Sequence, residues 1–205
     1  MSPRKAAALR GTDDDRNLRD HLVTTAQRLL ADQGAPGLTV RAIARAAGVA
    51  DGVLYNHFPD KDALLAAALG AHVTAAHAAL GPLPAPGTAT VRQNLATYLR
   101  AGLALHRAVL PVFAGLLSSP SVLTRFAESE AREADWRELL AAYLRAERDR
   151  ARIAPTADID AATAVLVGIC HDTVLTALLP GASGSHVDVE AVVTTLLSGI
   201  APSAD

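Results

Sequence analysis

The stretch LTVRAIARAAGVADGVLYNHFPDKDALL, residues 38–65, decides the fold that the sequence predicts. Thr39 stands immediately before an apolar-periodic run, so its hydroxyl can cap a first short helix. Gly48 supplies a left-handed turn, and a second helix of about two turns follows over 52–58. A helix, a tight glycine turn and a short exposed helix are the outline of a helix-turn-helix, a typical DNA-binding element.

Part of this stretch also carries a family resemblance. The string GVADGVLYNHFPDKDALL, residues 48–65, closely resembles the DNA-binding signature of TetR-family transcriptional regulators. The Gly-Val turn, the L-Y-x-H-F core and the following Pro-x-Lys are all present. The resemblance covers residues 17–65 and, beyond them, only the general layout. It implies an all-α fold, with a three-helix helix-turn-helix DNA-binding domain followed by a larger helical ligand-binding and dimerisation domain.

The resemblance and the helical spacing indicate which side chains meet DNA. Positions that approach bases in the family are matched by Arg41, Gly52, Tyr55 and Asn56. Positions at the phosphate backbone are matched by Thr39, Val53, Tyr55, His57 and Lys61. Independently of the resemblance, helical spacing over 51–58 places one group of side chains on the outward flank of the helix. Two other side chains point to the core. The flank is Asp51, Gly52, Tyr55 and Asn56, and the core pair is Leu54 and Phe58.

Three positions depart from the family pattern. Ala50 stands where a capping Ser is frequent, so either Asp51 caps the second helix or the helix start is weaker by roughly 1 kcal/mol. A carboxylate at Asp51 either accepts from a cytosine amino group or repels phosphate, and both alternatives stay open. Val53 offers no hydrogen bond, which weakens its assignment to a phosphate.

Composition agrees with a helical protein that lacks a strong general attraction to DNA. Half of the 205 residues are hydrophobic, mostly Ala, Leu and Val, which favours helices over sheets. The single cysteine, Cys170, suits a reducing compartment, and without a secretory signal pattern we expect a cytoplasmic protein. The net charge is −2, so DNA affinity has to come from a few placed contacts, which a homodimer would double.

The chain divides into three predicted segments. Residues 1–16 lack an apolar face and are expected to be a flexible tail, with a basic arm for the DNA minor groove as the alternative. The acidic run Asp13–Asp15 would then lie at the N-terminus of the first helix, over 17–33. The DNA-binding domain covers 17–62, and 63–205 forms the effector-binding and dimerisation domain.

Helical periodicity continues through the third segment. Helices are predicted at 60–80, 90–119, 122–132, 133–152, 159–179 and 187–200, with a loop at 81–89. Pro111 should kink or break its helix. The late arginines of 133–152, namely Arg145, Arg148, Arg150 and Arg152, are interpreted as a solvated face.

The two helices nearest the C-terminus are unusually apolar. His171 and Asp172 lie in the middle of 159–179, which argues against a membrane span. Together with 187–200 this helix suggests a subunit interface, and the resemblance implies a four-helix dimer bundle.

Chemistry-bearing residues elsewhere do not form a convincing catalytic or metal site. Cys170, His171 and Asp172 are consecutive, and neighbours on a helix point about 100° apart, so they cannot act as a triad. Asp172 is expected to have a partner, since an unpaired buried charge is costly. His72 and His77 lie on different helical faces, and we expect no cofactor, no metal and no enzymatic activity.

A second predicted site is an apolar effector pocket in the larger domain. Its candidate residues share apolar helical faces and a few polar groups, although each could also be plain core. They are His106, Phe113, Trp136, Leu140, Tyr143 and His171.

The sequence therefore predicts a ligand-responsive transcriptional regulator, a repressor that binds a palindromic DNA operator as a homodimer and is released by a small apolar effector. The alternative is a small-molecule-binding protein or enzyme with its pocket in the C-terminal domain and a vestigial DNA-binding head. A third interpretation, sequence-indifferent DNA packaging, conflicts with the nearly neutral head.

Overall fold

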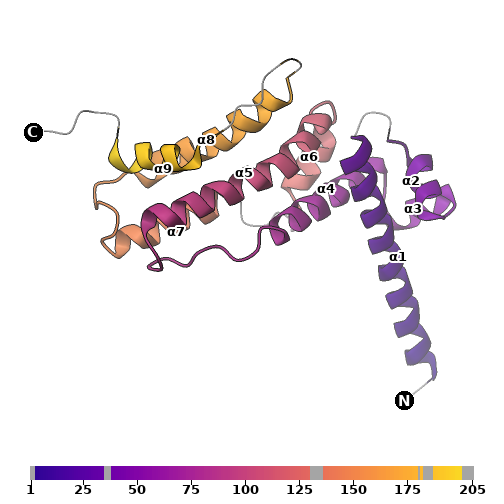
Figure 1. Ribbon diagram of the computed structural model, residues 1–205. Coiled ribbons are helices and arrows are strands. Elements are labelled where there is room, and N and C mark those ends of the chain that lie inside the picture. Colours follow the sequence, from indigo (N-terminus) through magenta and orange to yellow (C-terminus); the bar gives the residue numbers. More distant parts are fainter. Residues whose placement is uncertain (1–2, 35–37, 130–135, 180, 182–186, 200–205) are drawn as a thin grey trace, which may run out of the picture. The chain divides into compact units, whose positions relative to one another are not determined.

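The computed structural model confirms an all-α fold (Figure 1). It describes residues 3–34, 38–129, 136–179, 181 and 187–199, with side chains from Asp15 onward, and all regular structure in these residues is α-helical. The helices are α1 (Pro3–Gln33), α2 (Val40–Ala47), α3 (Asp51–His57), α4 (Lys61–Ala78), α5 (Val91–Leu116), α6 (Pro120–Ala127), α7 (Trp136–Asp149), α8 (Ile159–Ala177) and α9 (Val189–Ser198).

The chain forms two compact units. The first unit comprises Met1–Ala75 and Val112–Glu133, and the second comprises Ala76–Pro111 and Ala134–Asp205. The first unit therefore contains α6 and most of α4 in addition to the three helices of the predicted head. The functional division at residue 62 stays a prediction, because it concerns binding rather than compactness.

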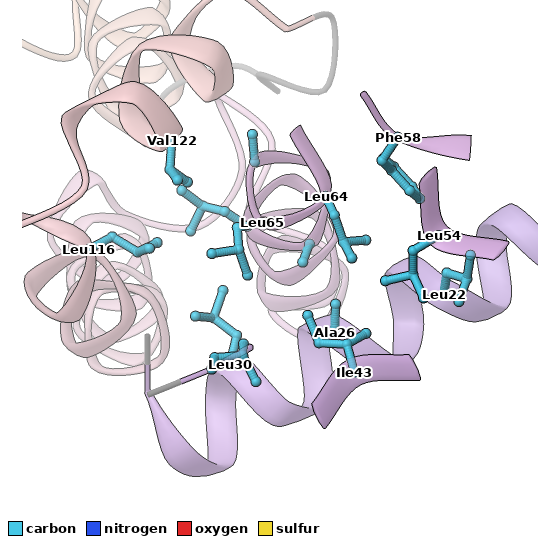
Figure 2. Close-up of a cluster of buried hydrophobic side chains, with 14 of the residues drawn as sticks. Leu22, Ala26, Leu30, Ile43, Leu54, Phe58, Leu64, Leu65, Leu116 and Val122 are labelled. Atoms are coloured by element: carbon cyan, nitrogen blue, oxygen red, sulfur yellow. The ribbon is translucent and has the colours of Figure 1, made fainter. Parts of the chain in front are cut away.

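The core of the first unit contains apolar side chains from distant parts of the chain (Figure 2). Leu22, Ala26 and Leu30 recur at one face of α1, as the periodicity predicts, and are 0–1% exposed. They meet residues of α2, α3, α4, α5 and α6, which include Ile43, Leu54, Leu64, Leu65, Leu116 and Val122. This shared core fixes the helix-turn-helix against α4.

The first helix is longer than predicted. It begins at Pro3, so residues 3–16 are its first turns rather than a tail, and the acidic run Asp13–Asp15 lies within the helix. Residues 3–10 include several alanines, a leucine and two arginines, which are good helix formers even without an apolar face. Absence of amphipathic periodicity was thus a poor guide to the start of α1.

Of the two outcomes predicted for Pro111, a kink or a break, the break does not occur. Helix α5 continues from Val91 through Pro111 to Leu116. Pro111 is exposed, so a carbonyl that loses its helical partner there can be hydrated at little cost.

Three aromatic side chains pack together in the core of the second unit. Tyr98 stacks on Tyr143 with ring centroids 4.4 Å apart and lies 6.0 Å from Trp136. All three are at most 7% exposed. The indole of Trp136 lies against Gly102 so closely that a Cβ built there would be 2.7 Å from Nε1. The α5–α7 contact therefore depends on the absence of a side chain at residue 102.

A buried ion pair fastens the loop before α5 to the end of α7. Glu147 is 0% exposed, and its Oε1 accepts from the backbone N–H of Gly87 at 3.2 Å. Arg152 Nη1 lies 3.2 Å from Oε2, and its guanidinium also donates to the carbonyls of Thr88 and Ala89. Arg152 is thus half-buried and structural, which corrects its assignment to a solvated face.

Helices α8 and α9, together with the two residues that follow α8, leave apolar side chains exposed in the single chain. Val165, Leu175, Leu178, Leu179 and Leu197 are 41–63% exposed. Asp172 is also exposed, so it needs no buried partner, contrary to the expectation from sequence. By length and composition alone, α5 and α8 could each cross a membrane, a test that core helices of soluble proteins also pass.

Candidate nucleic-acid interface

Local contacts build the helix-turn-helix as the sequence predicts. The Thr39 hydroxyl accepts from the N–H of Ala42 at 3.1 Å and caps α2. Gly48 ends that helix with φ +72°, in the left-handed region where a side chain would be strained. Asp60 caps α4 in the same way, accepting from Ala63 N–H at 2.9 Å.

Helix α3 presents one open face. Asp51, Gly52 and Asn56 are exposed and Tyr55 is 58% exposed, whereas Leu54 is buried at 2%. A Cβ built at Gly52 would meet no heavy atom of the described residues within 4 Å, so the space beside this glycine is open. The predicted flank is therefore free to approach a large partner.

Of the two alternatives predicted for the start of α3, the structure shows the one without a side-chain cap. Ala50 occupies the N-cap position and makes no side-chain capping bond. The Asp51 carboxylate instead lies 3.5 Å from Nε of Arg41, with relative side-chain exposures of 49% and 86%. Asp51 thus links α3 to α2 at the edge of the open face.

Four residues assigned to phosphate contacts lie in different environments. Thr39 is exposed, but its hydroxyl already caps α2. Lys61 and Val53 are half-buried. The side chain of His57 is only 6% exposed, and its Nδ1 lies 3.6 Å from Asp15 on α1. In this conformation His57 faces α1, so it has little surface to offer a phosphate.

Sequence reasoning missed a link between α6 and the start of α4. Arg125 donates to both carboxylate oxygens of Asp60 at 2.6 and 2.8 Å, and the Ser121 hydroxyl donates to Asp62. The Arg125 hydrogen bonds hold the pKa of Asp60 below its ordinary value of 3.8, aided by the Ala63 N–H. Asp60 directly precedes Lys61, so α6 supports the position from which this lysine would reach DNA. Arg125 carries no recognisable signal in the sequence, because its partner is 65 residues away.

The Asp60–Arg125 pair predicts an acid-dependent stability difference. An aspartate whose pKa is lowered by folding stabilises the fold above its unfolded pKa, and loses this contribution as pH falls through the folded pKa. Arg125→Gln should therefore have a lower melting temperature than wild type near neutral pH. The difference in melting temperature should become smaller in acid. Thermal unfolding from about pH 7 to about pH 3 measures this.

Substitutions at Asp60 separate the stability contributed by its ion pair with Arg125 from the stability contributed by its cap of α4. Asp60→Asn should match Arg125→Gln, because Asn still accepts from Ala63 N–H, whereas Asp60→Ala should melt lower than either. A gap between wild type and Arg125→Gln that stays constant with pH would contradict the prediction.

The predicted effector residues are divided between the two units. Phe113 belongs to the first unit, where it meets Phe126 edge-on at 5.5 Å, and the other five belong to the second. Trp136, Leu140 and Tyr143 are packed core, 2–3% exposed. His106 and His171 do lie together, with ring centroids 4.9 Å apart. The assignment of these residues to a ligand stays a prediction.

Each unit has a hollow lined by other residues. One of about 520 Å³ in the second unit lies between α5 and the start of α9 and includes Arg100 and Arg107. One of about 570 Å³ in the first unit lies among α1, α4 and α6. In the described part of the chain, no cluster of three or more His, Cys, Asp or Glu side chains could hold a metal.

The Cys170–His171–Asp172 run has the divergent geometry that a helix imposes. Cys170 is buried, His171 half-buried and Asp172 exposed. Burial raises the pKa of the Cys170 thiol to about 11, so a nucleophilic thiolate is scarce at neutral pH.

Comparison with known proteins identifies the family. The model of "Bacterial regulatory proteins, tetR family" matches residues 22–68, which span the end of α1, all of α2 and α3, and the start of α4. The TetR family transcription regulator SCO0332 is 27% identical, covers 90% of this chain and 99% of its own, and superposes with a TM-score of 0.60. The chain belongs to the TetR family.

Other TetR-family similarities are more limited in sequence or extent. The HTH-type transcriptional regulator EthR of Mycobacterium tuberculosis is 33% identical over 93 residues, 45% of this chain and 42% of EthR. The match thus spans less than half the length of this relative. FadR from Bacillus subtilis, solved with stearoyl-CoA, is 22% identical, covers 88% of this chain and 98% of its own, and has a TM-score of 0.59. At this identity it shows the shared fold.

Proposed function

We propose that this TetR-family chain is a transcriptional regulator that binds a palindromic DNA operator as a homodimer. The observation that carries the proposal is the open face of α3 within a capped helix-turn-helix. Its exposed Tyr55 and Asn56 can stack on sugar or base and bond base edges in a major groove. Neither side chain contributes to the core of the first unit. Acting on bacterial DNA, the protein would work in the cytoplasm.

The apolar surface of α8 and α9 supports the dimer. Large side chains such as Leu175, Leu179 and Leu197 are 41–63% exposed in the single chain, and covering them removes apolar area from water. A dimer would also double the DNA contacts of a head whose charge is nearly balanced. Two recognition helices about one DNA turn apart would enter successive major grooves.

Repression with release by an effector completes the proposal. Occupying a promoter is sufficient to block it, and an effector that prefers one conformation of the dimer would lower operator affinity by shifting populations. An apolar effector group agrees with the Ala-, Leu- and Val-rich composition of the chain and with the acyl chain of the stearoyl-CoA that FadR binds in its solved structure.

Substitutions of Tyr55, on the open face, and of Lys61, at the start of α4, test DNA binding. Tyr55→Ala combined with Lys61→Ala should abolish binding to the operator selected by wild type, because both contacts at the α3–α4 corner disappear. Binding is measured by titration of the labelled duplex, and the dimer and its melting temperature by sedimentation and thermal unfolding. The protein should remain folded, since Tyr55 is 58% exposed.

A matched pair of exposed substitutions in the same unit provides the control. Leu117→Ala with Arg28→Ala removes a large apolar side chain, 71% exposed, and an exposed cation from other surfaces. This control should bind the operator like wild type. Unchanged binding by the Tyr55/Lys61 variant would refute the site.

Selection from random duplex DNA separates the proposal from the enzyme or carrier with a vestigial head. Enriched palindromes support the regulator. Failure to enrich any sequence, together with turnover or tight binding of a small molecule, supports the alternative.

A further inference from the structure

We propose that Asp51 is a positioning residue that holds the Arg41 guanidinium for recognition of a guanine in each operator half-site. The inference rests on the proposed DNA-binding function and assigns a specificity role within it. It replaces the two alternatives that sequence left open for this carboxylate with a third, in which its first partner is a protein side chain.

The contact joins the first residue of α3 to the second residue of α2. Oδ2 of Asp51 lies 3.5 Å from Nε of Arg41. Asp51 has this oxygen available because Ala50 holds the N-cap position and α3 has no side-chain cap. The pair therefore places a guanidinium at the edge of the open face that Gly52 and Tyr55 share.

The guanidinium keeps its end groups for another partner. Asp51 engages Nε, while the side chain of Arg41 is 86% exposed. A guanidinium carries five N–H donors, so four remain on Nη1 and Nη2. Guanine presents O6 and N7 as a pair of acceptors in the major groove, and the planar end of arginine matches them. Adenine and cytosine place a donor amino group where this pair needs an acceptor.

Pairing also removes an electrostatic obstacle. An isolated carboxylate at the N-terminus of α3 would repel DNA phosphates, whereas the Arg41–Asp51 pair has no net charge. In the free protein both side chains are largely exposed, so the contact contributes little to folding. The arrangement thus matters when a duplex excludes water from the face, and a substitution should alter base preference more than stability.

Comparing selected motifs from the full-length variants tests the inference. Wild type, Asp51→Asn, Arg41→Gln and the control Asp32→Asn are each used to select from random duplex DNA. Asp32 is an exposed carboxylate on α1, so its substitution makes the same charge change within the same unit. We expect a G·C pair at one position of each half-site for wild type and the control.

Asp51→Asn and Arg41→Gln should both lose the preference at that same position, by about tenfold, and retain the rest of the motif. Asp51→Glu, which keeps the charge on a longer side chain, should lose less than Asp51→Asn. A merely structural role would lower affinity for all sequences and leave the motif unchanged. The melting temperatures of all variants should lie close to that of wild type.

The outcomes distinguish failure of the inference from failure of the proposed function. If wild type enriches a palindrome but Asp51→Asn and Asp51→Glu select the same motif, the inference is wrong and DNA recognition stands. The inference is equally wrong if the Asp51 and Arg41 variants lose base preference at different positions of the half-site. If wild type enriches nothing, the proposed function fails and the inference fails with it.

Discussion

Arg152→Met is expected to lower the free energy of unfolding by about 3 kcal/mol, because it leaves a fully buried carboxylate without its cation. Glu147 is 0% exposed, and in the variant the neutral N–H of Gly87 still donates to its Oε1 but no cation neutralises it. Arg152 also holds the carbonyls of Thr88 and Ala89, so the loop before α5 should loosen in the same variant. Chemical denaturation measures the energy, and hydrogen exchange of residues 87–90 measures the loosening.

A second arginine of the same region is the matched control. Arg145 pairs with Asp160 at 2.7 Å, but these side chains are 50% and 82% exposed. Arg145→Met should therefore cost at most about 1 kcal/mol. Adding Glu147→Gln to Arg152→Met should recover part of the loss, since the unpaired charge is removed. Equal effects of Arg145→Met and Arg152→Met would show that burial of Glu147 contributes nothing to the pair.

Gly102→Ala is expected to destabilise the protein by about 1–3 kcal/mol, against the usual sign of this change in a helix. Helix propensity alone favours Ala over Gly by about 1 kcal/mol. A Cβ at residue 102, however, would lie 2.7 Å from Nε1 and 2.8 Å from Cε2 of Trp136, whose rigid ring is only 3% exposed. Thermal and chemical unfolding measure the change in stability, which is positive if helix propensity dominates and negative if packing against Trp136 dominates.

A different helical glycine and a smaller aromatic provide the controls. Gly52→Ala meets no heavy atom within 4 Å, so it should not lower stability. Combining Gly102→Ala with Trp136→Phe should cost less than the sum of the two single changes, because the smaller ring yields space. If the changes in the free energy of unfolding are additive, or if Gly102→Ala stabilises the protein, close packing between residue 102 and Trp136 does not limit stability.

Features controlled by neighbours in the sequence were predictable. Caps at Thr39 and Asp60 join groups three residues apart, and the turn at Gly48 needs one left-handed residue. Helical periodicity likewise identified the buried face of α1 and the outward flank of α3. These features are local, so residue types and spacing are sufficient to predict them.

Where local rules were applied to a single position, tertiary context sometimes overrode them. Pro111 lies within α5 because its exposed surroundings tolerate a missing hydrogen bond, and Asp172 needs no partner because α8 turns it outward. The candidate effector residues share apolar helical faces, a property that buried core side chains such as Trp136 have in common with pocket walls.

By itself, the sequence determined the helical class, the helix-turn-helix and the residues of its exposed face, because short-range hydrogen bonds and amphipathic spacing specify them. Only the tertiary structure decided that Arg125 supports Asp60, that Arg152 neutralises Glu147 and that Trp136 requires a glycine at 102. It also decided that Asp51 contacts Arg41 instead of capping α3. These partners come from different elements, and their meeting depends on how helices pack, which residue types and spacing do not encode.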